Sequence, residues 1–426
     1  MTRTLLHLAV CGALTLGAIA PSAADPLGLQ SPLTLAQAVD RVLQAGFDVR
    51  TAVQAAQLAQ ADAATARAPL RPQLAISATA RNDNIPQLGM PIASQAYGGL
   101  SASVPLFTPS TGPSARASAL SALAAATSVD TARNDAFLAA VQAYRRAQLA
   151  LAVYQTREAN VRDQQDHLAT TQARVRAGTL PRYVVARDQA GLAVAQQSQE
   201  DAAAERDEAA NDLAAILDIS VATPPQIATP LDVTPFNGTL DHYLTRALAQ
   251  RPSIIAARQR VDAAQRSIAS ARGAYLPSAT LSAASYNGIS SPNLGRSGGQ
   301  VLLVASLPIA DGGLRAAAEE RARATLSDAQ ISYEQTRLGT ERDVRNAWRE
   351  LQAARTNLGT AQAAARDAQV TLRIALMRAA AGKGIDLEVL DALAVSASAR
   401  ETVVRSIARY DDAVALAHHA AGDLSL

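Results

Sequence analysis

The chain has 426 residues, a net charge of only +2, and 49% hydrophobic but just 3% aromatic residues. The balanced charge argues against a nucleic-acid surface, and a single cysteine excludes an internal disulfide framework. Alanine is abundant while large side chains are few, which favours closely packed long helices over one thick globular core.

Residues 1–24 have the pattern of a secretory signal peptide. Arg3 provides the positive charge, an apolar run extends from Leu5 to Ala20, and Ser22-Ala23-Ala24 is a small-residue cleavage site. We therefore expect the mature chain to begin near residue 25, outside the cytoplasm.

The only cysteine, Cys11, lies inside this apolar run. Lipoprotein cleavage needs a small residue before the cysteine, and the bulky Val10 stands there, so we expect no lipidation. No later stretch reaches about 18 consecutive apolar residues, which predicts that no helix spans a membrane.

The remaining sequence is an internal repeat. The stretch from Leu35 matches the stretch from Leu240 at a constant offset of 205 for about forty residues, which indicates one structural unit used twice. We expect a first repeat at residues 25–219, a proline-rich linker at 220–238 and a second repeat at 239–426.

Each repeat opens with a helical pattern. Thr34 is a candidate N-cap, and apolar residues follow at helical spacing to about Ala68. The second repeat has the same pattern from Leu240 to Ala274. Pro72 and Pro277 end the two segments, because proline cannot continue a helix.

Two extended segments follow in each repeat, with apolar residues alternating with small polar ones. We expect strands at residues 73–84, 95–107, 278–288 and 298–309. Each is about ten residues long, the length that a tilted transmembrane β-strand needs.

A very long helical segment comes next in each repeat, and a shorter helix returns. We expect these helices at residues 114–176, 183–219, 314–381 and 385–421. At 1.5 Å per residue the first would span about 95 Å. Val344, Leu351 and Leu358 recur every seven residues, which predicts a coiled-coil seam. The opening helices are expected to stack on the shorter returning helices and complete their length.

Four strands cannot close a barrel, and an open sheet edge is not tolerated in lipid. Bacterial barrels have eight or more strands, so several chains must pool theirs, and three chains would give twelve. The expected fold class is a mixed α+β membrane protein built from a duplicated unit, a coiled-coil helical hairpin with two transmembrane strands, as a homo-oligomer.

Short motifs resemble those of the TolC-type outer-membrane efflux family, and the resemblance extends from Leu33 to about Ala421. These motifs are Leu33-Thr34-Leu35-Ala36-Gln37-Ala38 at the start, Ala68 to Pro72 before the strands, Val104-Pro105-Leu106-Phe107 after them, and Gly382 followed by Glu388-Val389-Leu390-Asp391-Ala392.

The resemblance implies a homotrimer, with a twelve-stranded outer-membrane barrel over a helical periplasmic tunnel. Its partners would be a periplasmic adaptor (membrane fusion protein) and, through it, an inner-membrane pump. The expected function is a passive efflux duct for small molecules. The channel of a type I protein secretion system is the alternative, and the type of pump would discriminate between them. A purely structural coiled-coil rod would not need the strands. We expect no catalytic activity and no cofactor, since catalytic motifs are absent.

The turns between the long helices are the first candidate site. They comprise Arg174, Ala177, Gly178, Thr179 and Leu180 in the first repeat, and Arg378, Ala381, Gly382, Lys383 and Gly384 in the second. The glycines can simply close helical hairpins by adopting positive φ. The resemblance implies that these turns also dock the adaptor.

Glu388 and Asp391 are the second candidate site. They lie three positions apart, on one helix face just after a turn. The resemblance implies an acidic ring around the periplasmic entrance, where three chains would bring six carboxylates together and favour cations. The alternative is a pair of ordinary solvated carboxylates. The first repeat departs from the family pattern, with Val184 where an aspartate is common.

Other polar and aromatic residues are given ordinary roles. Tyr144 and Trp348 occupy matched places and are expected in the core, while Arg145 and Arg349 beside them are expected to be solvated. His167 stands alone on its helix and His418-His419 lie near the end of the chain, without a second metal ligand at a usual spacing, so we expect no metal site.

Overall fold

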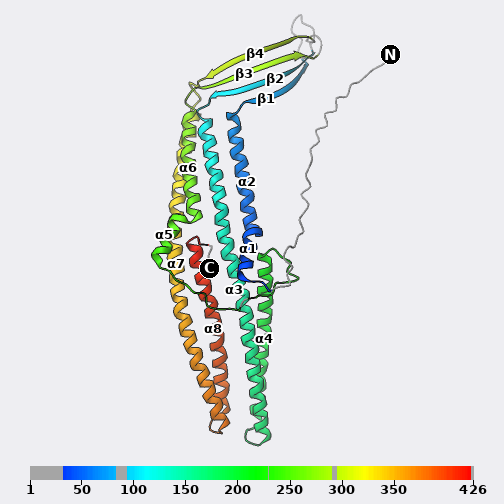
Figure 1. Ribbon diagram of the computed structural model, residues 1–426, viewed down its shortest axis with the longest axis vertical. Helices are drawn as coiled ribbons and strands as arrows, with labels where there is room; N and C mark the ends of the chain where they lie inside the picture. Colours follow the sequence, from blue (N-terminus) through cyan, green and yellow to red (C-terminus); the bar gives the residue numbers. More distant parts are fainter. Residues whose placement is uncertain (1–31, 83–93, 229, 290–294, 424–426) are drawn as a thin grey trace, which may run out of the picture.

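The structure is a computed structural model that describes residues 32–82, 94–228, 230–289 and 295–423. The expected signal peptide and Cys11 lie outside the described residues. The molecule is long and narrow, with a sheet at one end and two helical turns at the other (Figure 1).

The opening helices of both repeats are interrupted once. α1 (Leu35–Ala45) and α2 (Phe47–Arg67) break at Gly46, and a short 3-10 turn leads into the strands. Thr34 caps α1 in a capping box with Gln37. In the second repeat, α5 (Leu240–Gln250) and α6 (Pro252–Gly273) break where Pro252 removes a backbone donor.

The four strands form one antiparallel sheet in the order β1-β2-β3-β4. Their bounds are β1 Gln73–Asn82, β2 Ser94–Phe107, β3 Ser278–Gly288 and β4 Ser297–Ser306. β2 pairs with β3, for example Ala102 with Ala283, so the central contact joins the two repeats. β1 and β4 are the edge strands, and each has an unpaired edge within one chain.

Four long helices follow the strands: α3 (Thr111–Arg176), α4 (Tyr183–Ile216), α7 (Leu314–Ala380) and α8 (Asp386–Ala420). α3 pairs with α4 and α7 with α8, as two hairpins that end side by side (Figure 1). Among the residues that the structure describes, no helix is both long and apolar enough to cross a membrane.

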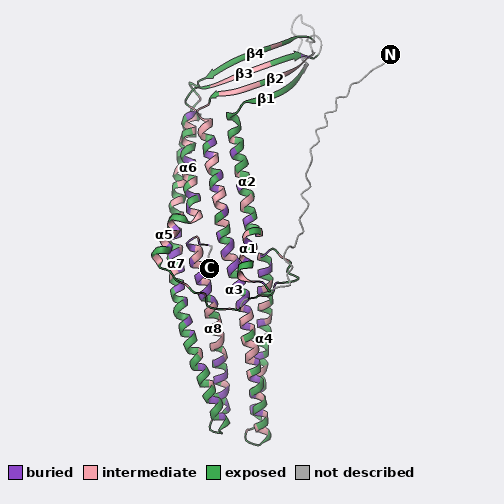
Figure 2. Ribbon diagram, viewed as in Figure 1, coloured by how far each residue is buried: buried purple, intermediate pink, exposed green. Residues whose placement is uncertain are grey.

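A heptad seam holds the second hairpin together. From Thr340 onward, the buried residues of α7 are spaced by three, four or seven positions, and most of the buried residues are alanine or leucine. They are Ala322, Thr340, Val344, Ala347, Leu351, Ala354, Leu358, Ala361, Ala368, Ala375 and Ala379. The predicted seam is therefore confirmed. Figure 2 shows the buried positions concentrated in the helices, whereas nearly all of the sheet is exposed or half-buried.

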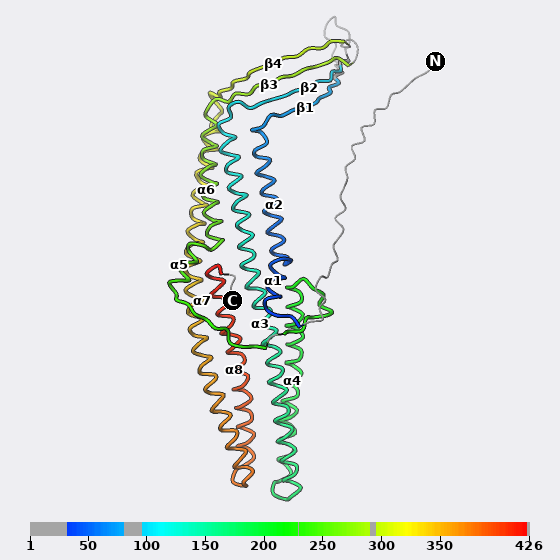
Figure 3. Tube along the Cα trace, in the orientation of Figure 1, coloured from blue at the N-terminus to red at the C-terminus, as the bar shows by residue number. Residues whose placement is uncertain are grey.

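The opening helices stack on the returning helices, as expected (Figure 3). The Arg41 guanidinium on α1 donates to the carbonyl oxygen of Leu217, just past α4, at 2.9 Å. In the second repeat, Arg246 on α5 forms an ion pair of 2.9 Å with Asp423, just past α8. An arginine thus ties each junction: Arg41 satisfies a carbonyl group at a helix C-terminus, and Arg246 pairs with a side-chain carboxylate just past one.

Each repeat has its larger core at the level of these junctions. Tyr144 is completely buried, and its hydroxyl donates to the carbonyl oxygen of Leu33 at 2.9 Å. Trp348, its counterpart, is partly buried against Tyr243 and Val414. The expected core role is confirmed for Tyr144, and Trp348 packs at the margin of the second core.

The linker from Ser220 to Gly238 crosses the helices between α4 and α5 (Figure 3). It covers Arg145, whose guanidinium lies 3.1 Å from Asp411 and donates to the Thr234 hydroxyl at 2.8 Å. The expectation that Arg145 is solvated was therefore wrong, because the linker folds over it. Arg349, its counterpart, is exposed as expected.

Asp412 follows Asp411 on α8 and is poorly solvated. Its Oδ1 atom is buried without a hydrogen-bond partner. Burial, and secondarily the neighbouring Asp411 carboxylate, raise the pKa of Asp412 to about 6. The ionised carboxylate is therefore unfavourable in the folded chain at neutral pH.

We expect Asp412→Asn to increase thermal stability at pH 7 to 8 and to change it little near pH 4. The folded-state pKa is higher than the unfolded one, so the cost of ionisation is fully present above pH 6, decreases as the pH falls from the folded pKa toward the usual value of 3.8, and is absent below that value. The stability difference should reach about 1 kcal/mol or more. Thermal unfolding of both proteins across this pH range measures it, and a pH-independent difference would contradict the assignment.

Candidate functional site

The turn of the first hairpin is a glycine-terminated helix end. α3 ends at Arg176, and Gly178 adopts a φ of 75°. The backbone N–H of Thr179 donates to the carbonyl oxygen of Arg174 at 2.9 Å, and the Thr179 hydroxyl donates to the same oxygen at 2.9 Å. This pattern satisfies carbonyl groups that the end of the helix would leave free.

The turn of the second hairpin repeats this geometry. Gly382 adopts a φ of 69°, and the N–H of Lys383 donates to the carbonyl oxygen of Arg378 at 2.9 Å. Gly384 donates to the same oxygen at 3.1 Å. A side chain at Gly178 or Gly382 would meet open space, so only the backbone conformation requires glycine there.

The two turns present a mostly exposed surface. The exposed members of the predicted set are Ala177, Gly178, Thr179, Arg378, Ala381, Gly382 and Lys383, while Arg174, Leu180 and Gly384 are half-buried. Arg174 donates to the carbonyl oxygen of Ala379 at 2.7 Å. The structure therefore brings the two predicted turns together and links them through this bond.

Glu388 and Asp391 lie on the first turns of α8, and both are exposed. Glu388 lies 3.8 Å from the Arg378 guanidinium, an exposed pair that contributes little to stability. The acidic ring requires several chains, so it remains a prediction.

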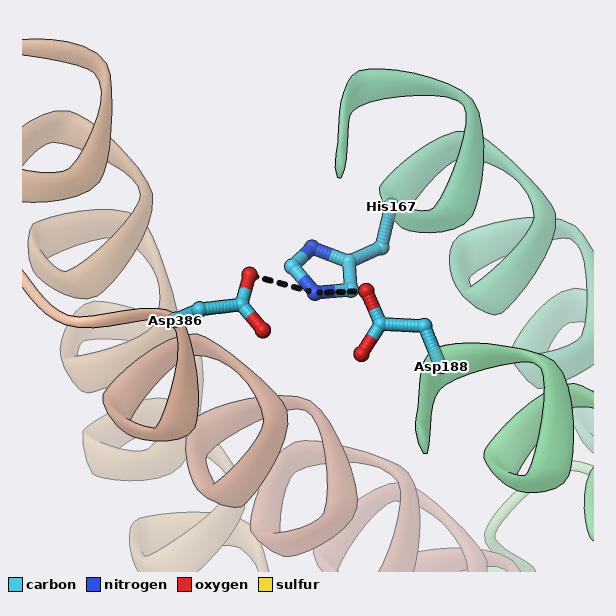
Figure 4. A group of neighbouring side chains, drawn as sticks. All are labelled: His167, Asp188 and Asp386. Carbon is cyan, nitrogen blue, oxygen red and sulfur yellow. Dashed lines mark ion pairs between the residues drawn. The ribbon is translucent and has the colours of Figure 1, made fainter. Parts of the chain in front are cut away.

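A buried polar cluster lies close to the turns, where the sequence predicted none. Nε2 of His167 on α3 lies 3.4 Å from Oδ2 of Asp188 on α4 and 3.2 Å from Oδ1 of Asp386 on α8. Figure 4 shows the imidazole between the two carboxylates. The interpretation of His167 as an isolated residue was therefore wrong.

Part of this cluster could have been found from the sequence. In a hairpin that turns at Gly178, His167 and Asp188 lie at nearly equal distances from the turn, so they face each other. Asp386 belongs to the other repeat, and nothing local places it against the first hairpin. His418 and His419 each lie near one carboxylate, Asp423 and Asp135 respectively.

Charged pairs also line the contact between α3 and α8 above this cluster. Arg157 lies 2.6 Å from Glu401, and Arg400 lies 2.5 Å from Asp163. Arg157 and Glu401 also line a cleft of about 440 Å³ between the hairpins. Toward the turns the contact between α3 and α8 is thus polar, whereas nearer the sheet it is apolar, because Phe137 and Val141 on α3 pack with Ala415 on α8.

The comparisons with known proteins agree with this architecture. The sequence model described as outer membrane efflux protein matches residues 38–218 and again residues 243–418. The chain belongs to this family. Membership places the protein in the cell outer membrane, with its helical part extending into the periplasm. The family matches the chain twice, once in each repeat.

Solved structures with the same fold include three outer-membrane proteins, each aligned over 91% of this chain. The CmeC outer membrane channel of Campylobacter jejuni is 19% identical over 85% of its own chain, with a TM-score of 0.80. The outer membrane protein VceC of Vibrio cholerae is 21% identical over 96%, with a TM-score of 0.79. The open state of the MtrE outer membrane channel of Neisseria gonorrhoeae is 23% identical over 89%, with a TM-score of 0.79. No curated protein matches the sequence.

We expect Gly178→Ala and Gly382→Ala to loosen the turns without unfolding the protein. An alanine at these positive φ angles costs about 1–2 kcal/mol, and no neighbouring atom clashes with the added methyl group. Hydrogen exchange at Thr179 and Lys383 should become faster, because their N–H groups close the turns.

Gly359→Ala is the matched control. Gly359 lies inside α7 with open space around it, so alanine there should stabilise the helix by about 0.5–1 kcal/mol. Unchanged exchange at the turns in the first two variants would refute the role given to positive φ.

Proposed function

We propose that the protein is the trimeric outer-membrane channel of a tripartite efflux system, a passive exit duct for small molecules. One observation carries the proposal: long helices connect a sheet with two unpaired edges to a pair of exposed turns at the opposite end. Such a chain is suited to be one sector of a tube. Membership in the outer membrane efflux protein family supports the same function.

The direction of the edge strands supports a closed assembly. Because the sheet has four antiparallel strands, β1 and β4 run in opposite directions. The β4 edge of one chain can therefore pair antiparallel with the β1 edge of the next, and the ring can close without a change of pattern. Three chains would give twelve strands, within the range of bacterial outer-membrane barrels.

The outer surface of the sheet fits a lipid environment. Leu74 and Ile76 on β1 are 71% and 85% exposed in the single chain, and Val301 and Leu303 on β4 are 75% and 61% exposed. Within each pair the residues are two positions apart, so they share one face of the strand. Exposure of several large apolar side chains on one sheet would be unfavourable in water.

The opposite end supports docking to a periplasmic partner. The two turns are exposed, and hydrogen bonds, including the one from Arg174 that links them, hold them in a fixed conformation. Because the turns are already ordered, they lose little conformational entropy when a partner binds. We assign them to a periplasmic adaptor that connects the channel to an inner-membrane pump. Glu388 and Asp391 would then ring the entrance and favour cations.

We expect cysteines placed on β1 and β4 to cross-link neighbouring chains into a covalent trimer. One cysteine would replace Leu74, Ile76 or Ala78, and the other Val301, Leu303 or Ala305, to sample the unknown register. Pairs that meet across the edge satisfy disulfide geometry and should give a ladder ending at three chains on denaturing gels.

Ile76→Cys with Leu100→Cys is the matched control. These positions pair within one chain, so the disulfide should leave the gel band monomeric. A ladder that ends at two chains, or none from any pair, would exclude the trimer.

We expect a photo-reactive amino acid at Thr179 or Lys383 to capture the adaptor in intact cells. The same group at Glu320, an exposed position at the sheet end of α7, should capture none. Mass spectrometry identifies the captured protein. An adaptor of a proton-driven exporter supports efflux of small molecules, whereas one of a protein-secreting ABC transporter supports the type I alternative. Equal capture from Glu320 would reject docking at the turns.

A further inference from the structure

The cluster of His167, Asp188 and Asp386 joins three helices from both hairpins. We propose that it binds one divalent transition-metal ion of the Zn²⁺ type and that the bound ion fastens the first hairpin to the second. The three residues offer one ligand atom each, and these atoms all lie within 4.8 Å of one another.

The spacing of the ligand atoms fits a tetrahedral ion. Zinc ligands lie about 2.0–2.2 Å from the metal, which places two tetrahedral ligand atoms about 3.4 Å apart. Nε2 of His167 lies 3.4 Å and 3.2 Å from the nearest oxygens of Asp188 and Asp386. The two carboxylates would have to rotate only slightly to complete three corners, and water would supply the fourth.

Two of the three ligands lack hydrogen-bond partners at their ligand atoms, whereas Oδ1 of Asp386 accepts a long hydrogen bond of 3.5 Å from the Thr171 hydroxyl. Nε2 of His167 and both carboxylate oxygens of Asp188 are buried without a hydrogen-bond partner. The side chain of Asp188 is 0% exposed, so bulk solvent does not reach these oxygens. Buried carboxylates are unfavourable unless cations compensate them, and Asp188 and Asp386 share the single guanidinium of Arg187.

The position of Asp188 makes packing a poor explanation for it. The residues that follow it at seven-residue intervals on α4 are Ala195, Ala202 and Ala209, all buried. Its counterpart in the second repeat, at the offset of 204 that relates Gly178 to Gly382, is Ala392, which is also buried. The hairpin therefore accepts alanine at this position, and the aspartate needs another reason.

In each carboxylate, Arg187 contacts the oxygen atom that is not the nearest one to His167. Its guanidinium forms an ion pair with Oδ2 of Asp386 and lies 3.6 Å from Oδ1 of Asp188. The other oxygen of each carboxylate is left facing the imidazole. Outer groups of this kind commonly orient metal ligands. Two carboxylates against one guanidinium also leave one negative charge uncompensated between these three side chains, which favours a cation.

The donor set narrows the class of ion. One imidazole nitrogen with two carboxylate oxygens suits Zn²⁺ and related divalent ions. Three ligands are too few for Ca²⁺, which takes six to eight oxygens, and Cu(I) prefers sulfur. An adjoining cleft of about 360 Å³, lined in part by His167, Thr171 and Asp386, gives the ion a path from solvent.

The test is Zn²⁺ binding to the full-length protein, purified in detergent and freed of metal with a chelator. Titration against a chromophoric zinc indicator should show one tight site per chain. His167→Gln and Asp188→Ala should weaken this site at least 100-fold. Asp188→Ala introduces the residue found at the matched position of the second repeat, so it should fold. Co²⁺ should give the visible absorption of a tetrahedral site in the wild type only.

His419→Gln is the matched control, because His419 pairs with one carboxylate, Asp135, away from the turns. It should leave binding unchanged. Zn²⁺ should also raise the thermal stability of the wild type and slow hydrogen exchange at the start of α8, but do neither in Asp188→Ala. The proposal would be overturned if the wild type bound no Zn²⁺ ion per chain, or if His167→Gln and Asp188→Ala bound Zn²⁺ as tightly as the wild type. The cluster would then only fix the register of the helices.

The proposed metal site does not rest on the proposed function. The metal measurements do not depend on it, since they need neither an adaptor nor transport. Zinc binding without adaptor capture would refute the proposed docking and support the metal site. Adaptor capture without zinc binding would support the docking and refute the metal site.

Discussion

Narrow seams of small side chains hold the hairpins of this protein together, and the rest of its architecture depends on them. Alanines at heptad positions of α7 and α4 allow the helices to approach closely over a great length. Each alanine buries little apolar area, so each turn of the seam stabilises the hairpin only weakly. The larger apolar cores lie where the opening and returning helices meet. Between these cores and the turns, the hairpins therefore rely on many small contacts, with one further apolar cluster beside the second turn.

The contact between the two hairpins follows a different principle near their turns. There α3 meets α8 through the pairs Arg157–Glu401 and Arg400–Asp163 and the histidine cluster, and Arg174 adds a bond to α7. Nearer the sheet, α3 and α8 pack through the apolar residues Phe137, Val141 and Ala415. Water can replace polar partners when such a contact opens, whereas an apolar seam would expose area that water does not compensate. Near their turns the two hairpins are thus joined by a contact that separates more easily than the apolar seam within each hairpin.

The sequence predicted the elements because each has a local cause. Proline at 72 and 277, glycine at 178 and 382, alternation in the strands and heptads in the helices all act over short distances. The burial of Arg145 escaped prediction because Asp411 and the linker reach it from distant parts of the chain. The histidine cluster escaped for the same reason, since Arg187 and Asp386 are separated by 199 positions. Of this cluster, only the contact between His167 and Asp188 could be predicted from the sequence, because the two residues lie at similar distances from the turn that joins their helices.

The two repeats have kept one backbone plan while their polar residues diverged. At the offset of 204, Thr371 and Ala392 stand where the first repeat has His167 and Asp188. The second repeat instead contributes Asp386 at the start of α8, where Arg182 is the first-repeat counterpart. The cluster therefore occurs once among the described residues, at the contact between hairpins, and neither repeat could form it alone. Duplication supplies two equivalent hairpins, and divergence of a few residues supplies the polar contact that joins them.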